Sequence, residues 1–158
     1  QFPDYRINIS FFREISNAEE LRMKAADLPF ALIDAKLVCT VEQLCSAVYR
    51  ALIDVTYNKM RTKSLQSECL FCLSPTSNIG EAFRTFGIKD DSTEIICVRL
   101  ESSEMPPASE PIFDCILGSE IDFEDGNLAK FHDKISIRKV CTHYSAVINH
   151  SIQNMLLT

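Results

Sequence analysis

The pattern of hydrophobic and polar residues marks four short stretches of this chain as strands. Residues 6–12 alternate apolar and polar side chains, the period of a half-buried strand. Residues 30–34 form a short apolar run. Residues 68–73 and 93–100 are apolar on both faces, as central strands are. The pattern therefore predicts a sheet of about four strands.

Helical periodicity is clearest in the long segment that follows Thr40, where Thr40 and Gln43 have the spacing of a capping box. Apolar residues then recur at steps of three and four, which marks a core-facing side. Tyr49, Ile53 and Tyr57 form a second apolar stripe on another side of the same helix. One helix cannot point both stripes into one small core. The second stripe either meets another packed layer of the domain or binds a partner protein.

Two shorter helices have start signals in the sequence. Ser16 and Glu19 have the spacing of a capping box and predict a helix to about residue 26. Asn78 is placed to cap a helix over residues 79–86, and Gly87 to end it. Each of these helices is flanked by a predicted strand, so helices and strands are interleaved along the chain.

The last third of the chain is less regular. Residues 101–111 are rich in Ser and Pro and predict a mobile loop, and residues 112–117 a short helix. Residues 133–158 predict a C-terminal helical segment, as one helix or two. The expected fold is one α/β (α+β) domain over residues 1–158, with a central mixed or antiparallel sheet of about four strands flanked by helices.

Composition and charge narrow the class of protein. The chain has 158 residues, 46% of them hydrophobic and 24% charged, which suits one globular domain. Its formal net charge of −6 argues against broad coating of nucleic acid. The densest basic run is Lys59, Arg61 and Lys63, just past the long helix. This run has two interpretations. It is either a solvated loop whose positive charges interact favourably with the dipole at the C-terminal end of the helix, or a contact for nucleic-acid phosphates, with Tyr57 available to stack on a base.

The seven cysteines, an odd count, do not suggest a disulfide framework. No secretory signal opens the chain, so we expect a reducing compartment and cysteines that fill the core. Cys69 and Cys72 form a CxxC, but on a strand their side chains would point to opposite faces. The acidic stretch 120–126 lacks the ligand spacing of a calcium loop. We predict no catalytic residue, metal ligand or cofactor, and hence a binding module.

Four stretches of the chain resemble the PRPK-binding protein family, most closely its fungal members. They are residues 38–43 (VCTVEQ), 57–62 (YNKMRT), 73–79 (LSPTSNI) and 82–91 (AFRTFGIKDD). The resemblance is strong over the first 100 residues and moderate between residues 121 and 139. Members of this family are the small kinase-binding subunit of the KEOPS (EKC) complex.

The resemblance implies a non-catalytic subunit that binds and stimulates the small atypical kinase/ATPase of KEOPS. It also implies help in recruiting tRNA by its 3′ CCA end, for N6-threonylcarbamoyladenosine formation next to the anticodon. Yeast-type complexes are linked to telomere maintenance and transcription, and the implied localisation is nucleus and cytoplasm, without a membrane. The alternatives are a stand-alone RNA-binding protein and a thiol- or metal-regulated protein built on the CxxC.

The family's contacts map onto two groups of residues in this sequence. The kinase-binding group lies on the long helix and the C-terminal helix and comprises Tyr49, Ile53, Tyr57, Ile152, Met155 and Leu156. The tRNA-binding group comprises Arg50, Lys59, Arg61 and Lys63.

Overall fold

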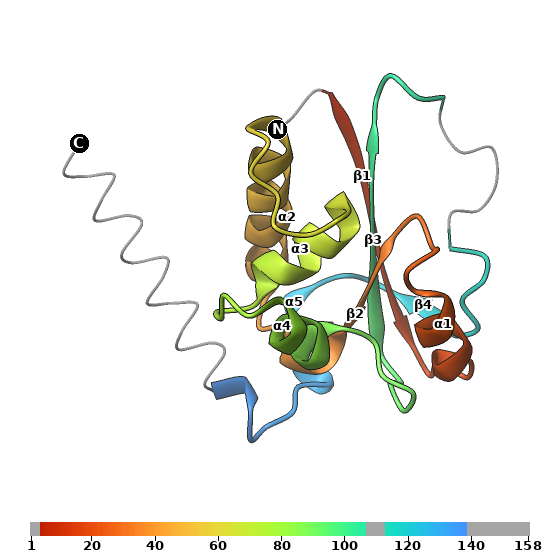
Figure 1. Ribbon diagram of the computed structural model, residues 1–158. Coiled ribbons are helices and arrows are strands. Elements are labelled where there is room, and N and C mark those ends of the chain that lie inside the picture. Colours follow the sequence, from red (N-terminus) through yellow and green to blue (C-terminus); the bar gives the residue numbers. More distant parts are fainter. Residues whose placement is uncertain (1–3, 107–112, 139–158) are drawn as a thin grey trace.

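Four antiparallel strands form one sheet in the computed structural model, which describes residues 4–106 and 113–138 (Figure 1). Their order in the sheet is β2-β3-β1-β4. The strands are β1 (Tyr5–Arg13), β2 (Ala31–Asp34), β3 (Ile95–Ser102) and β4 (Ser119–Ile121). The predicted sheet of about four strands is confirmed. Of the two predicted forms, mixed and antiparallel, the sheet is antiparallel.

The helices flank this sheet. They are α1 (Ala18–Lys24), α2 (Val41–Thr56), α3 (Leu65–Leu73), α4 (Ile79–Phe86) and α5 (Asp125–Lys130), with a 3₁₀ turn, η1 (Ala35–Leu37). In Figure 1, α2, α3 and α4 lie on one side of the sheet and α1 on the other. The predicted α+β class, with a sheet between helices, is confirmed.

The alternation of side chains along β1 separates two hydrophobic clusters. Phe11 pairs with Ile96 of β3 and joins the cluster that includes Leu52 of α2. Its neighbour Phe12 points to the other face and joins the cluster that includes Leu21 of α1. Each face of the sheet thus buries apolar side chains against its own helices, because successive residues of a strand point to opposite faces.

Residues 68–73 are the last six of the nine residues of helix α3, so the prediction of a central strand there is wrong. The hydroxyl of Ser64 accepts a hydrogen bond from Ser67 N at 3.1 Å and starts the helix. All six residues from Glu68 to Leu73 are buried. A helix buried on all sides shows no polar face, so its sequence has the same continuous apolar run as a buried strand.

The predicted N-terminal caps are confirmed at two of the three helices. Thr40 Oγ1 accepts from Gln43 N at 3.1 Å and Asn78 Oδ1 from Glu81 N at 3.0 Å, so α2 and α4 begin as predicted. The capping box of Ser16 and Glu19 at α1 is wrong, since the N-cap residue is Asn17, no side chain caps the helix, and the Ser16 hydroxyl donates to Leu117 O instead. Asn17 instead donates to Cys115 O and accepts from Leu117 N, which fastens α1 to the segment before β4.

Gly87 ends α4, but in an extended rather than a left-handed conformation, with φ of −71°. A Cβ atom at this position would lie 2.4 Å from the carbonyl oxygen of Phe83. The residue is therefore a glycine because the backbone of the preceding turn approaches it closely.

The expected loop and the later elements are described only in part. Glu101 and Ser102 still belong to β3, and residues 107–111 lie outside the described residues, so the mobility of this loop stays a prediction. The predicted helix over residues 112–117 is wrong in its described part, where residues 113–115 form a turn. Of the expected helical segment 133–158, only its start is described, with Ile137 N donating to Asp133 O.

The cysteines follow the prediction in part. Cys69, Cys72 and Cys97 are free and buried, which confirms their role in the core, whereas Cys45 and Cys115 are free but exposed. Cys39 is disulfide-bonded, so the expectation of thiols throughout is wrong at this position. An odd number of cysteines excludes a fully paired framework, but it does not exclude a single bond.

Candidate functional site

The stripe on α2 presents two aromatic rings to solvent. The exposed fraction is 51% for Tyr49 and 67% for Tyr57, while Ile53 between them is half-buried. Leu44 and Leu52, on the core-facing side of the helix, are fully buried. Among the described residues, no second packed layer closes over the two rings. Of the two interpretations of this stripe, the described structure favours a surface for a partner.

The basic run of Lys59, Arg61 and Lys63 follows directly after the C-terminal end of α2. Tyr57 is the C-cap residue, and Asn58 follows with a φ of 54°, a left-handed conformation that asparagine tolerates. Lys59 N then donates to Asp54 O at 2.7 Å. The basic run therefore begins directly beside Tyr57, the last residue of the exposed stripe.

A buried carboxylate holds this loop in place. Glu68 on α3 is fully buried, and its Oε2 accepts from Arg61 N at 3.1 Å, Thr62 N at 3.0 Å and Thr62 Oγ1 at 2.8 Å. The guanidinium of Arg61 lies 5.8 Å from the centre of the Phe71 ring, within range of a cation–π contact. Lys59 and Lys63 are exposed. The loop thus has a fixed backbone and presents its charged side chains at the surface.

Arg50, the fourth residue predicted to bind tRNA, lies on α2 and is exposed. Burial raises the pKa of the Cys72 thiol to about 12, and the positive charge of Arg50 partly opposes this rise. Arg50 lies one turn before Asp54 on α2, and residues four apart share a face of a helix. The structure places it near the junction of the two helices from which the basic run emerges.

The sequence did not predict the cluster formed by Asp54, Glu68 and Cys72. One oxygen from each carboxyl group and the sulfur of Cys72 all lie within 4.8 Å of one another. Because residues 68–73 are helical rather than extended, Glu68 and Cys72 lie one turn apart, with Cβ atoms about 6 Å from each other rather than about 13 Å as on a strand. The fully buried Cys69 is not part of this cluster. An acidic residue inside an apolar run was the only signal in the sequence.

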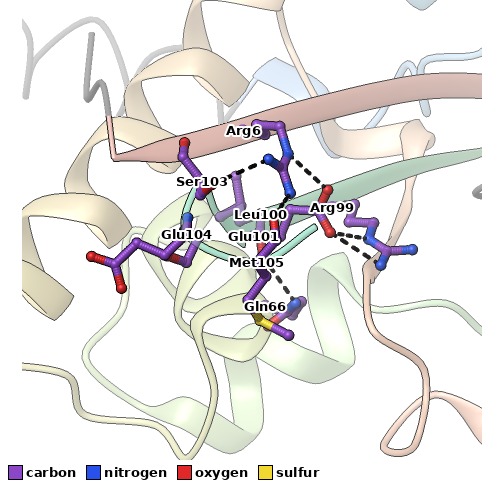
Figure 2. A network of polar contacts seen from close by, with 9 residues as sticks. Arg6, Gln66, Arg99, Leu100, Glu101, Ser103, Glu104 and Met105 are labelled. Atoms are coloured by element: carbon purple, nitrogen blue, oxygen red, sulfur yellow. Dashed lines mark hydrogen bonds and ion pairs between the residues drawn. The ribbon is translucent and has the colours of Figure 1, made fainter. Parts of the chain in front are cut away.

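A second polar network ties the end of β3 to β1 (Figure 2). The carboxylate of Glu101 lies between two arginines, 3.2 Å from Arg6 Nε and 3.1 Å from Arg99 Nη2. Arg6 also donates to the backbone oxygens of Ser103 and Met105. These bonds anchor the first residues of the segment predicted as a mobile loop.

An open cleft of about 1040 Å³ lies between α1, β2, α3 and α4. Phe83 of α4 is 39% exposed and lines this cleft. Arg22 also lines it but is paired with Asp90. Nothing in the described part of the chain identifies a ligand for this cleft.

The acidic stretch and one histidine have structural roles near the start of α2. Asp125 Oδ1 accepts from Val41 N at 2.8 Å, and His132 Nε2 lies 2.8 Å from Val38 O. The two side chains fasten the segment around α5 to the beginning of α2. The three predicted contacts on the C-terminal helix, Ile152, Met155 and Leu156, lie outside the described residues.

Comparisons with known proteins assign the chain to a family. Residues 12–153 match the family described as kinase binding protein CGI-121. The EKC/KEOPS complex subunit CGI121 of Candida glabrata is 46% identical over 121 residues, which cover 77% of this chain and 69% of the relative. The protein of the same name from Kluyveromyces lactis is 42% identical over 143 residues, 89% of each chain.

A vertebrate relative is similar over almost the same length. The EKC/KEOPS complex subunit TPRKB of Danio rerio is 34% identical over 141 residues, which cover 88% of this chain and 79% of the relative. No helix in the described ranges is both long and apolar enough to cross a membrane. The match to the family extends over most of the chain and includes all of α2 and the basic loop, so the chain belongs to the CGI-121 family of kinase-binding proteins.

Proposed function

We propose that this chain is the kinase-binding subunit of an EKC/KEOPS complex, with no catalytic activity of its own, and that it binds and stimulates the small atypical kinase/ATPase of that complex. The match of residues 12–153 to a kinase-binding family carries the proposal, and relatives named as EKC/KEOPS subunits support it. The contact surface proposed here is the exposed stripe on α2, together with Ile152, Met155 and Leu156. Tyrosine is among the side chains that most often dominate binding at protein interfaces.

Co-purification tests the proposal directly. The full chain is produced together with the kinase subunit of a fungal EKC/KEOPS complex, and the pair is analysed by size-exclusion chromatography and by ATPase measurement. We expect the two proteins to elute as one complex, and the ATPase rate of the kinase to rise when this chain is added. Separate elution at micromolar concentrations of both proteins would refute the proposal.

We propose in addition that the chain helps the complex to recruit tRNA by its 3′ CCA end for N6-threonylcarbamoyladenosine formation. Arg50, Lys59, Arg61 and Lys63 would contact the phosphates, and the exposed Tyr57 ring would stack on an unpaired base. The net charge of −6 leaves only this local patch for the contact, so other subunits would supply most of the affinity. Localisation in nucleus and cytoplasm, and links to telomere maintenance and transcription, belong to the same proposal.

Charge reversal tests the tRNA contact. We expect the triple substitution Lys59→Glu, Arg61→Glu and Lys63→Glu to weaken tRNA binding by the complex by about tenfold or more, because three phosphate contacts are replaced by repulsion. The salt dependence should change with it: the slope of log K against log salt concentration should become shallower by about 2 for single-stranded phosphates. Both quantities are measured by filter binding at several salt concentrations.

A matched control reverses three exposed charges elsewhere, with the substitutions Arg13→Glu, Lys24→Glu and Lys134→Glu. It changes the net charge by the same amount, so a general electrostatic effect would weaken tRNA binding equally in both variants. Equal weakening in the two triple variants, or unchanged affinity in the first, would exclude the patch as a specific contact. Kinase binding should be retained in both.

A further inference from the structure

Three side chains with metal-binding atoms meet where α2 packs against α3. Asp54 belongs to the last turn of α2, and Glu68 and Cys72 are four residues apart on α3. Their two oxygens and one sulfur lie within 4.8 Å of one another. We propose that Asp54, Glu68 and Cys72 bind a divalent cation of the zinc type.

The buried carboxyl group of Glu68 gives the strongest support. Glu68 is fully buried, and its Oε1 is the one buried side-chain oxygen or nitrogen without a hydrogen-bond partner in the described part of the chain. A buried polar atom without a partner is costly, and a bound cation would supply the missing interaction. The other oxygen, Oε2, accepts three hydrogen bonds from Arg61 and Thr62. Such bonds orient carboxylates that ligate metals.

The donor set selects the class of metal. A sulfur ligand beside two carboxylates favours zinc and chemically similar ions, whereas calcium and magnesium prefer oxygen ligands alone. Zinc takes four ligands, and with three from the protein the fourth position holds water. Asp54 is half-buried, and its Oδ2 lies 3.7 Å from the sulfur of Cys72. Asp54 is the most exposed of the three ligands, so the cluster lies nearest the surface on its side.

Binding would link three parts of the molecule. The cation would join the last turn of α2 to α3 and, through Glu68, to the backbone of the loop at Arg61 and Thr62. The Cys72 thiol gives up its proton to solvent when it ligates, as zinc-bound cysteines do. The expected consequence is a native state that zinc stabilises, since the unfolded chain holds no preformed site.

Cobalt spectroscopy and zinc affinity test the site in the full-length chain. Co²⁺ is added under argon, and we expect a sulfur-to-cobalt charge-transfer band that Zn²⁺ then displaces. The zinc dissociation constant, measured with a competing chelator, should rise at least about tenfold in Cys72→Ser and in Asp54→Asn. The thermal unfolding midpoint of the unmodified chain should rise with zinc concentration, and the rise should be lost in both variants.

Cys45→Ser is the matched control, since Cys45 is a free and exposed cysteine of α2 outside the cluster. It should keep the cobalt band and the zinc affinity. Absence of the band, its persistence in Cys72→Ser, or an equal loss in Cys45→Ser would overturn the proposal. Asp54→Asn removes the negative charge and one oxygen of a half-buried side chain while keeping its shape, so it tests the site even if Cys72→Ser folds poorly. Kinase co-purification is a separate measurement, and its outcome does not depend on this one.

Discussion

The double substitution Tyr49→Glu, Tyr57→Glu should weaken binding to the kinase by about three orders of magnitude. Removal of a tyrosine anchor at an interface costs about 2 kcal/mol or more of binding free energy. Removal of two costs about 4 kcal/mol, which raises the dissociation constant roughly a thousandfold. The two residues are eight positions apart on one helix, about 12 Å at 1.5 Å per residue, so their effects should add. Isothermal titration calorimetry with the purified kinase measures the change.

The controls for this prediction separate binding from folding. Met23→Glu replaces a side chain of α1 that is 73% exposed, so it introduces one negative charge on a different surface and should leave the affinity unchanged. The free energy of unfolding of the double variant should differ from that of the unmodified chain by no more than about 0.5 kcal/mol, because both rings are largely exposed. Ile53 is left intact because it is half-buried. Full retention of kinase binding by the double variant would show that the stripe on α2 is not the interface.

Glu68→Ala should reduce the free energy of unfolding by about 3 kcal/mol or more. The substitution leaves the amides of Arg61 and Thr62 and the Thr62 hydroxyl without their acceptor, and it opens a cavity inside α3. Hydrogen bonds to a charged acceptor contribute about 1.5–3 kcal/mol each, and their contributions are not fully additive. Urea unfolding followed by circular dichroism measures the free energy, and hydrogen exchange at Arg61 and Thr62 should become faster.

Two further variants identify the cause of the loss. Glu81→Ala removes an exposed acidic side chain from α4 and should change the free energy of unfolding by no more than about 0.5 kcal/mol. Glu68→Gln keeps an oxygen for the three donors and should recover part of the stability lost in Glu68→Ala. If Glu68→Ala were as stable as Glu81→Ala, the carboxyl group would not be what holds the loop.

Local sequence signals were sufficient for much of the fold. The alternation in β1, the Thr40 cap of α2 and the Asn78 cap of α4 each depend on residues within one turn or one strand, so they could be recognised without knowledge of the fold. Two errors arose where a distant contact decided the outcome. Asn17 binds the backbone at Cys115 and Leu117 instead of capping α1, and nothing near Asn17 in the sequence indicates this.

The other error concerned α3, and it determined how the candidate site was interpreted. On a strand, Glu68 and Cys72 would lie about 13 Å apart, too far to join one cluster. As a helix buried against α2, the same residues place a carboxyl group under the basic loop and a thiol next to Asp54. The second apolar stripe on α2, in contrast, was predicted from periodicity alone, because residues four apart on a helix share a face whatever surrounds it, but periodicity did not predict that the stripe is exposed.

The sequence by itself determined the α+β class, the long helix with two apolar stripes, the single basic run and the family resemblance. These features depend on the order of neighbouring residues, and backbone geometry translates that order directly into faces and ends of elements. Only the tertiary structure decided that the Tyr49 and Tyr57 rings are exposed, and that Asp54, Glu68 and Cys72 meet. Burial and clustering depend on which elements pack together, and α2 and α3 meet through contacts that neither sequence segment specifies alone.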